Sequence, residues 1–399
     1  MAAAPDVLYV SYNGIAEPLV ESQVLAYLRK LAGYGFRFTL LTFERRPPAD
    51  ADALRRRLAD EGIRWHWLRS VSGFGPLTSL LDVARGLSRV RQLHRQQGFS
   101  LVHARSFLPA LIAQRFKRRH GVPYLNDLRG FWIDEKVYRG RLRENGAVYR
   151  IAKRLETQVL RDSDYIVSLS ERGLRTLDSW GAWRGEPPPS ATIPTCVDLD
   201  RFVPDAADTT GAAPVFGYVG SLSEEYLPEE IFAWFAAALV AFPAARLHLV
   251  TRSEPAPLQA ALARHRIPAE RVRLLALPPA RVPAEIRQFD AALSFIRPHL
   301  AKFASCPTKV GEYLACGVPV VSNRDIGDLD TLLADGAAGC LVDDFGDAAR
   351  ARSFEQLAAL WRDPQLKTRC RALAERHFSL ARGSERYALA YRRILGTAP

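Results

Sequence analysis

The chain has 399 residues, which is too long for one ordinary hydrophobic core and predicts two domains of about 200 residues each. Its hydrophobic fraction of 48% is that of a soluble globular protein. No apolar run reaches the ~18 residues that a membrane span needs, so an integral membrane protein is not expected. The formal net charge of +12 favours an anionic partner, but no recognition motif for nucleic acid accompanies it, so a membrane surface is the better candidate.

Short apolar runs alternate with amphipathic stretches through the first half of the chain. This alternation is typical of a parallel sheet that is covered by helices on both faces. We expect strands at 7–12, 36–43, 63–68, 100–104, 122–127 and 165–170. We expect helices at about 21–34, 51–60, 77–97, 107–119 and 147–162.

A segment rich in Pro, Gly, Ala and Asp at 202–214 is interpreted as a linker, after which the same alternation begins again. Strands are expected at 215–220, 246–251, 272–277, 290–296, 318–322 and 339–342. Helices are expected at about 228–241, 347–361, 364–376 and 382–394. The predicted fold class is therefore α/β, with two doubly wound parallel sheets that place ligands at the carboxyl ends of their strands.

The most informative segment is SCPTKVGEYLACGVPVV at 305–321. Pro307 stands where a helix is expected to begin, with Ser305 or Cys306 within reach of its N-cap and Thr308 in its first turn. The free amides at the start of a helix attract anions, so this segment predicts a phosphate site.

Two charged side chains add to this site. Lys309 lies in the first turn and could supply a point charge to a phosphate, although a solvated helix lysine is the alternative. Glu312 lies three residues later on a similar face of the helix, where its carboxylate could accept hydrogen bonds from ribose hydroxyls. Together they predict a site for a nucleoside diphosphate.

The P-T-K-x-x-E and G-V-P-V-V patterns of 307–321 resemble the donor-binding signature of retaining glycosyltransferases of family 4, which have the GT-B fold. Glu312 matches the second of two glutamates in that signature, which holds the ribose; the first falls on Ala304 and is missing. The resemblance implies two Rossmann-like domains that face each other across a cleft. We expect an acceptor domain at 1–205, a donor domain at 206–380, and a final helix at 381–399 that crosses back.

Three glycine-containing loops complete the donor site that the resemblance implies. Gly14 in SYNGIAEPLVESQ lets backbone amides approach a phosphate or sugar, with a plain turn glycine as the alternative. Gly220 and Ser221 match a strand-end loop of the family, and the amides of Gly327 and Asp328 match a loop that touches the donor. Asp328 could equally be an N-cap.

A basic pair usually follows the strand-end loop in the family and neutralises the donor diphosphate. Here Glu224 and Glu225 follow instead. The positive charge must then come from Lys309, with Arg252, Lys302 or Arg297 as further candidates.

Polar and aromatic residues after two strands of the first half predict the acceptor side. Arg105, in LVHARSF, could bind a phosphate or carboxylate, and a surface arginine is the alternative. The segment NDLRGFWIDE at 126–135 is expected to be a cleft loop. It would provide catalytic Asp127 and Arg129 beside Lys309, and Trp132 and Glu135 as acceptor contacts; a salt-bridged structural loop is the alternative.

The resemblance implies that a hexosyl group moves from a nucleotide diphosphate sugar to an acceptor hydroxyl, with retention and without a metal or other cofactor. The pathway that we expect is the assembly of cell-surface polysaccharide or glycolipid. A nucleotide-sugar epimerase of the same fold and a non-catalytic nucleotide-sugar-binding protein remain alternatives. No G-x-G-x-x-G or P-loop motif supports hydride transfer or NTP hydrolysis.

Cysteine usage and charge predict where the protein works. Five scattered cysteines without a C-x-x-C pair fit a reducing cytoplasm and argue against a zinc site, and no signal peptide is recognised. Residues 51–150 hold 20 basic and 8 acidic residues, which favours a peripheral position on the inner face of the membrane and a lipid-linked glycan acceptor. The alternative is a solvated arginine-rich surface, since arginine outnumbers lysine 48 to 7.

Overall fold

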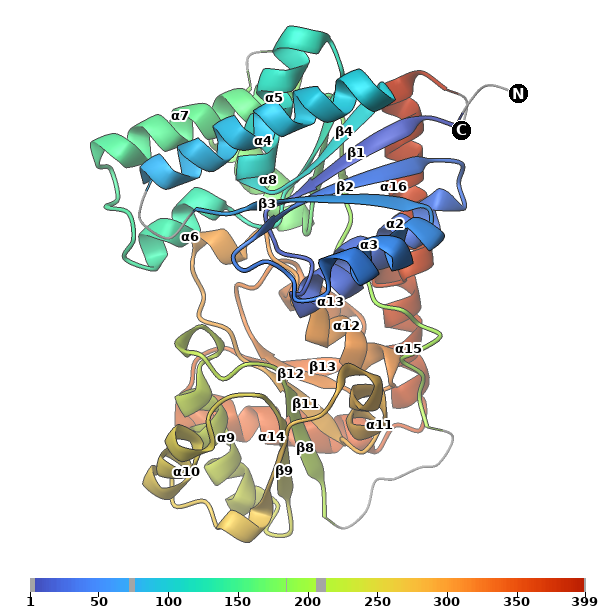
Figure 1. Ribbon diagram of the computed structural model, residues 1–399. Coiled ribbons are helices and arrows are strands. Elements are labelled where there is room, and N and C mark those ends of the chain that lie inside the picture. The colour runs from blue at the N-terminus through green and yellow to red at the C-terminus, as the bar shows by residue number, and fades with distance from the viewer. Residues whose placement is uncertain (1–3, 72–75, 184, 206–212, 398–399) are drawn as a thin grey trace. The chain divides into compact units, whose positions relative to one another are not determined.

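The computed structural model describes residues 4–71, 76–183, 185–205 and 213–397 (Figure 1). Residues 206–212, most of the predicted linker, lie outside the described residues. The chain forms two compact units. The first comprises Met1–Pro194, Phe303–Ser305 and Leu380–Pro399, and the second comprises Thr195–Lys302 and Cys306–Ser379.

The first unit is built on a parallel sheet of seven strands in the order β3-β2-β1-β4-β5-β6-β7. The strands are β1 (Asp6–Ser11), β2 (Arg37–Glu44), β3 (Ile63–Arg69), β4 (Leu101–Arg105), β5 (Tyr124–Asp127), β6 (Tyr165–Ser168) and β7 (Ser190–Thr192). The six predicted strands are confirmed. The edge strand β7 was not predicted, because its three residues include no apolar run.

Ten helices of the first unit lie within the described residues. They are α1 (Pro18–Val20), the π-helix η1 (Glu21–Leu25), α2 (Ala26–Ala32), α3 (Ala51–Asp60), α4 (Pro76–Gln97), α5 (Phe107–His120), α6 (Trp132–Tyr138), α7 (Ala147–Asp162), α8 (Glu171–Ser179) and α16 (Leu380–Leu395). The expectation that 126–135 forms a loop is wrong at its second half, where α6 begins at Trp132.

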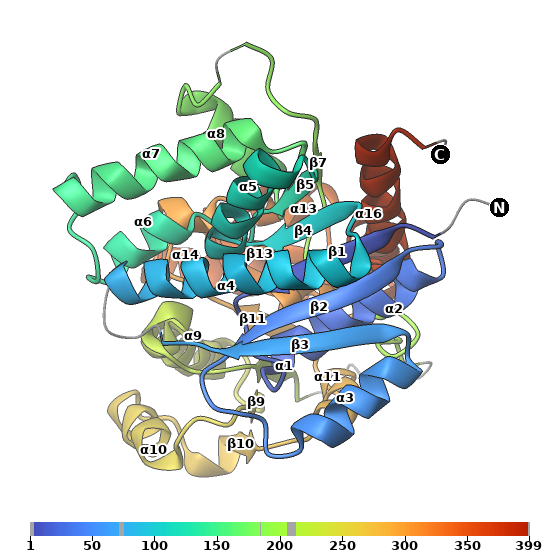
Figure 2. The ribbon, with the colours of Figure 1, turned by 45° about the horizontal axis from the view of Figure 1, so that its top comes forward.

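Helices α4, α5 and α7 cover one face of the first sheet, where they lie side by side (Figures 1 and 2). Their apolar side chains share one core with strand residues such as Leu41 and Val102. On the other face α16 packs beside α2. The ring of Tyr391 in α16 meets Phe36 edge-on, with ring centres 5.1 Å apart, so the last helix belongs to the core of the unit that the first strand begins.

The second unit repeats the plan with six parallel strands in the order β10-β9-β8-β11-β12-β13. They are β8 (Val215–Val219), β9 (Arg246–Val250), β10 (Val272–Leu275), β11 (Ala291–Ser294), β12 (Val320–Asn323) and β13 (Gly339–Val342). All six were predicted. Each sheet reverses its strand order once, between β1 and β4 and between β8 and β11, and in such folds ligands bind at the carboxyl ends of strands beside that reversal.

The helices of the second unit lie on both faces of its sheet. They are η2 (Glu224–Tyr226), α9 (Pro228–Ala241), α10 (Pro255–Arg264), η3 (Ala269–Arg271), η4 (Pro279–Arg281), α11 (Val282–Ile286), η5 (Leu300–Lys302), α12 (Thr308–Ala315), α13 (Leu329–Asp335), α14 (Asp347–Trp361) and α15 (Leu366–His377). One core joins α9 and α14 to the sheet, and another joins α12, α13 and α15 to it. Helix α10 was not predicted.

Candidate functional site

In the second unit, the side chain of Lys309 extends from the start of α12 to the end of β8. Its Nζ atom lies 3.9 Å from the centre of the Tyr218 ring and 4.4 Å from the centre of the Tyr226 ring, which gives cation–π attraction. This Nζ is buried and has no hydrogen-bond partner among the described residues. Buried ammonium groups are normally hydrogen-bonded, so Lys309 is a strong candidate for a cation that binds a ligand.

Gly220 leaves room for this ammonium group. The residue directly follows β8, and its φ of 133° lies in the region that favours glycine. Its N–H donates to the carbonyl oxygen of Val250 over 2.9 Å. A Cβ atom at this position would lie 3.1 Å from the Lys309 Nζ, so the glycine keeps the backbone open beside the lysine.

Packing fixes the position of α12 against the sheet. The Tyr313 hydroxyl accepts a hydrogen bond from the Val219 N–H over 2.8 Å and so ties the helix to the end of β8. Gly311 lies so close to its neighbours that a Cβ there would meet the Phe378 ring at 3.1 Å and the Val197 side chain at 3.2 Å. The first turn of α12 is therefore held by a rigid frame.

Burial shifts both charged groups of α12 toward neutrality. It lowers the pKa of Lys309 to about 7, although the Glu312 carboxylate acts to raise it. It raises the pKa of Glu312 to about 7, against the opposing effect of Arg201 and Lys309. No hydrogen bond joins the two side chains, so each remains able to take a ligand group.

The N-cap of α12 differs from the expectation. The helix begins at Thr308, and Pro307 is the N-cap residue, whose side chain makes no capping hydrogen bond. The predicted cap by Ser305 or Cys306 was based on a helix that began one residue earlier. Ser305 itself belongs to a short segment, Phe303–Ser305, that groups with the first unit.

Glu225 occupies the region where the family signature would place basic side chains. Its carboxylate forms an ion pair with the Lys302 Nζ over 2.6 Å and a hydrogen bond with the His299 Nε2 over 3.4 Å. The hydrogen bond from His299, and then the one from Lys302, hold the pKa of Glu225 at about 2. Lys302, one of the further candidates for neutralising a diphosphate, is thus already engaged by a carboxylate.

The other residues predicted for the donor lie in loops of the second unit. Ser221 and Arg252 are exposed, and the Ser221 carbonyl accepts from the Tyr218 hydroxyl over 2.6 Å. The Gly327 N–H donates to the Lys302 carbonyl over 2.9 Å. Asp328 is the N-cap residue of α13 but makes no side-chain capping hydrogen bond.

The amides around Gly14 in the first unit have protein partners. The Gly14 N–H donates to Glu17 over 3.0 Å, and the Ile15 N–H donates to Glu44 over 2.8 Å. A Cβ atom on Gly14 would lie 2.4 Å from a carboxylate oxygen of Glu44. Glycine is therefore needed at this position because the Glu44 carboxylate leaves no room for a side chain. The Gly14 and Ile15 amides already have acceptors.

Asp127, at the end of β5, is the centre of a buried network. Its carboxylate accepts from the Tyr387 hydroxyl over 3.1 Å, lies 3.3 Å from the His103 Nε2, and pairs with the Arg129 guanidinium over 3.6 Å. The His103 Nδ1 lies 2.7 Å from the Tyr391 hydroxyl. Burial alone would raise the pKa of Asp127, but Arg129 and His103 hold it at about 2, so the carboxylate stays ionised.

Trp132 and Glu135 lie on α6 and have neighbours on or beside that helix. The Trp132 ring lies 5.6 Å from the Phe107 ring and carries the Lys136 Nζ over its face at 4.8 Å. Glu135 forms an ion pair with Arg139 over 2.5 Å. These contacts match the alternative of a salt-bridged structural segment, and the structure does not bring either side chain into the Asp127 network.

The sequence interpretation missed four residues that shape these sites. Tyr218 and Tyr226 flank Lys309, and Tyr387 and Tyr391 reach Asp127 and His103 from α16. The pair on α16 has a sequence signal, because tyrosines four residues apart lie on one face of a helix. Nothing in the sequence identifies the partners, which are 260 and 288 residues away.

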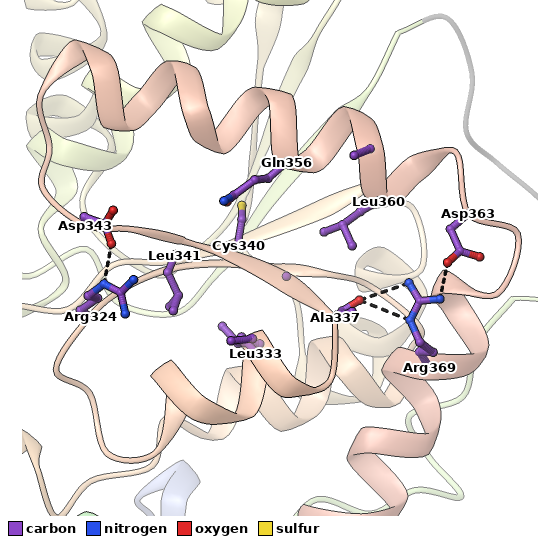
Figure 3. A pocket seen from close by; sticks show the side chains of 13 residues that line it. Arg324, Leu333, Ala337, Cys340, Leu341, Asp343, Gln356, Leu360, Asp363 and Arg369 are labelled. Atoms are coloured by element: carbon purple, nitrogen blue, oxygen red, sulfur yellow. Dashed lines mark hydrogen bonds and ion pairs between the residues drawn. The ribbon is translucent and has the colours of Figure 1, made fainter.

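A cavity of about 530 Å³ lies elsewhere in the second unit, along β13 (Figure 3). Its ends are marked by two ion pairs, Arg324 with Asp343 and Arg369 with Asp363. Leu333, Leu341 and Leu360 lie between them. None of the residues predicted for donor or acceptor lines this cavity.

Two family models match the chain. A glycosyl transferase 4-like domain matches residues 20–194, and the model for glycosyl transferases group 1 matches residues 213–359. The chain belongs to the group 1 glycosyl transferases. A D-inositol 3-phosphate glycosyltransferase from Catenulispora acidiphila is 26% identical to this chain, and the match covers 67% of this chain. That match spans 64% of the relative's own length, less than two thirds.

Solved structures with the GT-B fold share the architecture over nearly the whole chain. Sucrose-phosphate synthase from Thermosynechococcus elongatus gives a TM-score of 0.74 at 15% identity and covers 98% of this chain and 99% of its own. Anabaena HepE in complex with UDP and glucose gives 0.68 at 16% identity, with 96% and 98% covered. The predicted fold class, two Rossmann-like parallel-sheet domains, is confirmed.

No helix among the described residues of the glycosyl transferase chain is long and apolar enough to cross a membrane. No group of three or more His, Cys, Asp or Glu side chains there is arranged to hold a metal ion.

Replacing Lys309 by methionine should make the protein more stable and unable to bind its ligand. Met has a similar length, and the change removes a buried ammonium that lacks an acceptor, which is worth about 1 kcal/mol or more. The measurement is the urea-unfolding midpoint at pH 7. The control Lys30→Met, at an exposed lysine, should change stability by less than about 0.5 kcal/mol. A Lys309→Met protein less stable than wild type would show that the lysine is well compensated in the free protein.

Proposed function

We propose that this chain transfers a hexosyl group from a nucleotide diphosphate sugar to an acceptor hydroxyl, with retention at the anomeric carbon and without a metal ion. The observation that carries the proposal is the buried, unpartnered ammonium of Lys309 at the start of α12, beside the glycine that follows β8. A diphosphate there would receive the lysine charge and the positive end of the α12 helix dipole together.

Lys309 is the residue that we assign to catalysis. When the bond from the anomeric carbon to the diphosphate breaks, the electron pair stays on the phosphate oxygen, and a fixed cation stabilises that charge without reorganising. Glu312 lies one turn deeper on α12 and is proposed to accept from the ribose hydroxyls. Gly220 and the exposed Ser221 and Arg252 are proposed to line the diphosphate and sugar side.

Asp127 and Arg129 take a different role in this proposal. The Asp127 carboxylate is buried and already has Tyr387, His103 and Arg129 around it. Such a group is not free to exchange protons with substrate, so we assign Asp127 as a positioning residue that holds Arg129 in place. Trp132 and Glu135 are half-buried on α6, and their role as acceptor contacts stays a prediction.

The relatives support the donor class without fixing it. HepE was solved with UDP and glucose, and the Catenulispora relative is named as a glycosyltransferase of an inositol phosphate. We propose a nucleotide diphosphate hexose as donor and a glycan or lipid-linked acceptor, in cell-surface polysaccharide or glycolipid assembly on the cytoplasmic face of the membrane. An epimerase of the same fold would act on the donor with no acceptor.

A calorimetric titration with UDP-, GDP-, ADP-, dTDP- and CMP-sugars tests the donor site. One nucleotide should bind, and Glu312→Ala should weaken it by roughly 10- to 100-fold, because a carboxylate that accepts from ribose contributes about 1.5–3 kcal/mol. The control Glu355→Ala, at an exposed position of α14, should leave Kd unchanged. An unchanged Kd in Glu312→Ala would reject the assignment, and turnover of donor without acceptor would favour the epimerase.

Donor affinity should peak near pH 7. Below that pH, Glu312 gains a proton in the free protein and accepts more weakly; above it, Lys309 loses its proton and its charge. The alkaline fall should vanish in Lys309→Arg, since arginine keeps its proton. The acid fall should vanish in Glu312→Gln. Titrations from pH 5.5 to 8.5 measure both limbs (these bounds are roughly 1.5 units on either side of the peak), and an alkaline fall that persists in Lys309→Arg would contradict the assignment.

The exposed side of α7 is the surface that we propose for the membrane. Val148 and Ile151 are 47% and 57% exposed, with Arg150 and Arg154 exposed on the same helix. Apolar side chains flanked by arginines suit an anionic lipid surface.

Vesicle sedimentation tests this surface. Binding should rise with the fraction of anionic lipid, fall with added salt, and drop severalfold in the double variant Val148→Ser, Ile151→Ser. The control Leu389→Ser, at a residue of α16 that is 45% exposed, should bind like wild type. Binding that ignores salt would exclude an electrostatic attraction.

A further inference from the structure

Arg105 stands where the first sheet reverses its strand order. It is the last residue of β4 and lies opposite Ser11, the last residue of β1. The strand order changes direction between these two strands. Ligands of doubly wound sheets bind at this place, at the carboxyl ends of the strands.

The Arg105 guanidinium is buried and only partly hydrogen-bonded. The residue is 5% exposed, and its Nη2 donates to the Gln23 Oε1 over 2.9 Å. Its Nε and Nη1 are buried without a hydrogen-bond partner among the described residues. These two atoms carry three of the five N–H groups of an arginine, so most of its donors face no acceptor.

Charge counting around Arg105 leaves one positive charge without a counter-ion. Asp127 is the carboxylate of the network, and it pairs with Arg129. Burial lowers the pKa of His103, so this ring is neutral at pH 7. Burial raises the pKa values of Tyr9, Tyr387 and Tyr391, so they are neutral as well. Burial and the nearby Arg129 lower the pKa of Arg105, although Asp127 acts to raise it, so two guanidiniums share one carboxylate.

Gln23 holds two guanidiniums side by side. The same Oε1 atom accepts from Arg105 over 2.9 Å and from Arg129 over 2.8 Å. Gln23 lies in η1, a single turn of π-helix, and such turns are frequent at functional sites. An amide can accept from two arginines but cannot neutralise either of them, and a bound water has the same limitation. An anion satisfies both the donors and the charge.

We propose that Arg105, with Gln23 and Arg129, forms a receptor for one anionic group, and that the acceptor substrate carries this group as a phosphate or carboxylate. The first part stands on the first unit alone; the second rests on the proposed transferase function. Gln23 is the positioning residue that keeps the two guanidiniums convergent, and Arg105 is the residue that contacts the anion.

Thermal unfolding in inorganic phosphate, at constant ionic strength, tests the receptor. The test uses the Lys309→Met variant, so that phosphate binding at the donor site does not contribute to the change in Tm. Phosphate should raise the Tm of this protein saturably, by roughly 2–4 °C. The shift should disappear when Arg105→Gln is added and remain with the control Arg115→Gln, at a half-buried arginine of α5. No saturable shift in Lys309→Met, or a shift that survives Arg105→Gln, would overturn the proposal.

Gln23→Glu gives an independent test that does not depend on losing an arginine. The new carboxylate would sit between the two guanidiniums and serve as a built-in anion. The substitution is made in the Lys309→Met background, where we expect a higher Tm than in Lys309→Met alone and no response to phosphate. A double variant that responds to phosphate as Lys309→Met does would overturn the proposal, even if Arg105→Gln fails to fold.

Matched ligands then identify the source of the anion. Hexose monophosphates and hexuronic acids represent soluble acceptors, a short-chain lipid phosphate represents a lipid-linked one, and neutral hexoses are the control. A compound of either class that binds more tightly than inorganic phosphate, and loses at least tenfold in affinity in Arg105→Gln, supports the acceptor assignment. If none does, the acceptor does not carry the anion. The donor Kd should be unchanged in Arg105→Gln, so loss of acceptor binding can be distinguished from loss of donor binding.

Discussion

Each unit holds, at the carboxyl end of its parallel sheet, a buried cation with N–H groups that have no acceptor among the described residues. Removing a charge from water costs several kcal/mol unless a partner compensates it. In the second unit the faces of Tyr218 and Tyr226 offset part of that cost for Lys309. In the first unit Gln23 does so for Arg105. The surrounding cores must stabilise both sites, and this is why rigid packing around them matters.

The first unit depends on α16 for the electrostatics of its strand ends. Tyr387 and Tyr391 lie one helical turn apart and reach Asp127 and His103. Without these hydroxyls the Asp127 carboxylate would lose a hydrogen bond that it accepts from Tyr387. His103 would lose the hydrogen bond at Nδ1 that helps to set its tautomer. Because Asp127 in turn pairs with Arg129, α16 contributes to the electrostatics at the end of β5.

The fold was readable from the sequence because buried parallel strands are short apolar runs, and twelve of these runs were placed correctly. β7 and α6 were not, since Ser190–Thr192 is polar and Trp132–Tyr138 mixes aromatic and charged residues as a loop would. Lys309 and Glu312 could be proposed as site residues because a helix start has local signals, and that role stays a prediction. The sharing of Gln23 by Arg105 and Arg129 was not, because side chains 82 and 106 residues apart in sequence meet only through tertiary packing.

Acidic residues follow β8 where the family signature has basic ones, so Lys309 is left as the main source of positive charge at this strand end. Glu225 directs its carboxylate to Lys302 and His299, so the loop that would bring cations in related signatures instead consumes one. Lys309 reaches the same strand end from α12 and finds space because Gly220 has no side chain. In the proposed function, a cation on a helix that Tyr313 ties to the end of β8 would stabilise the leaving diphosphate with little reorganisation.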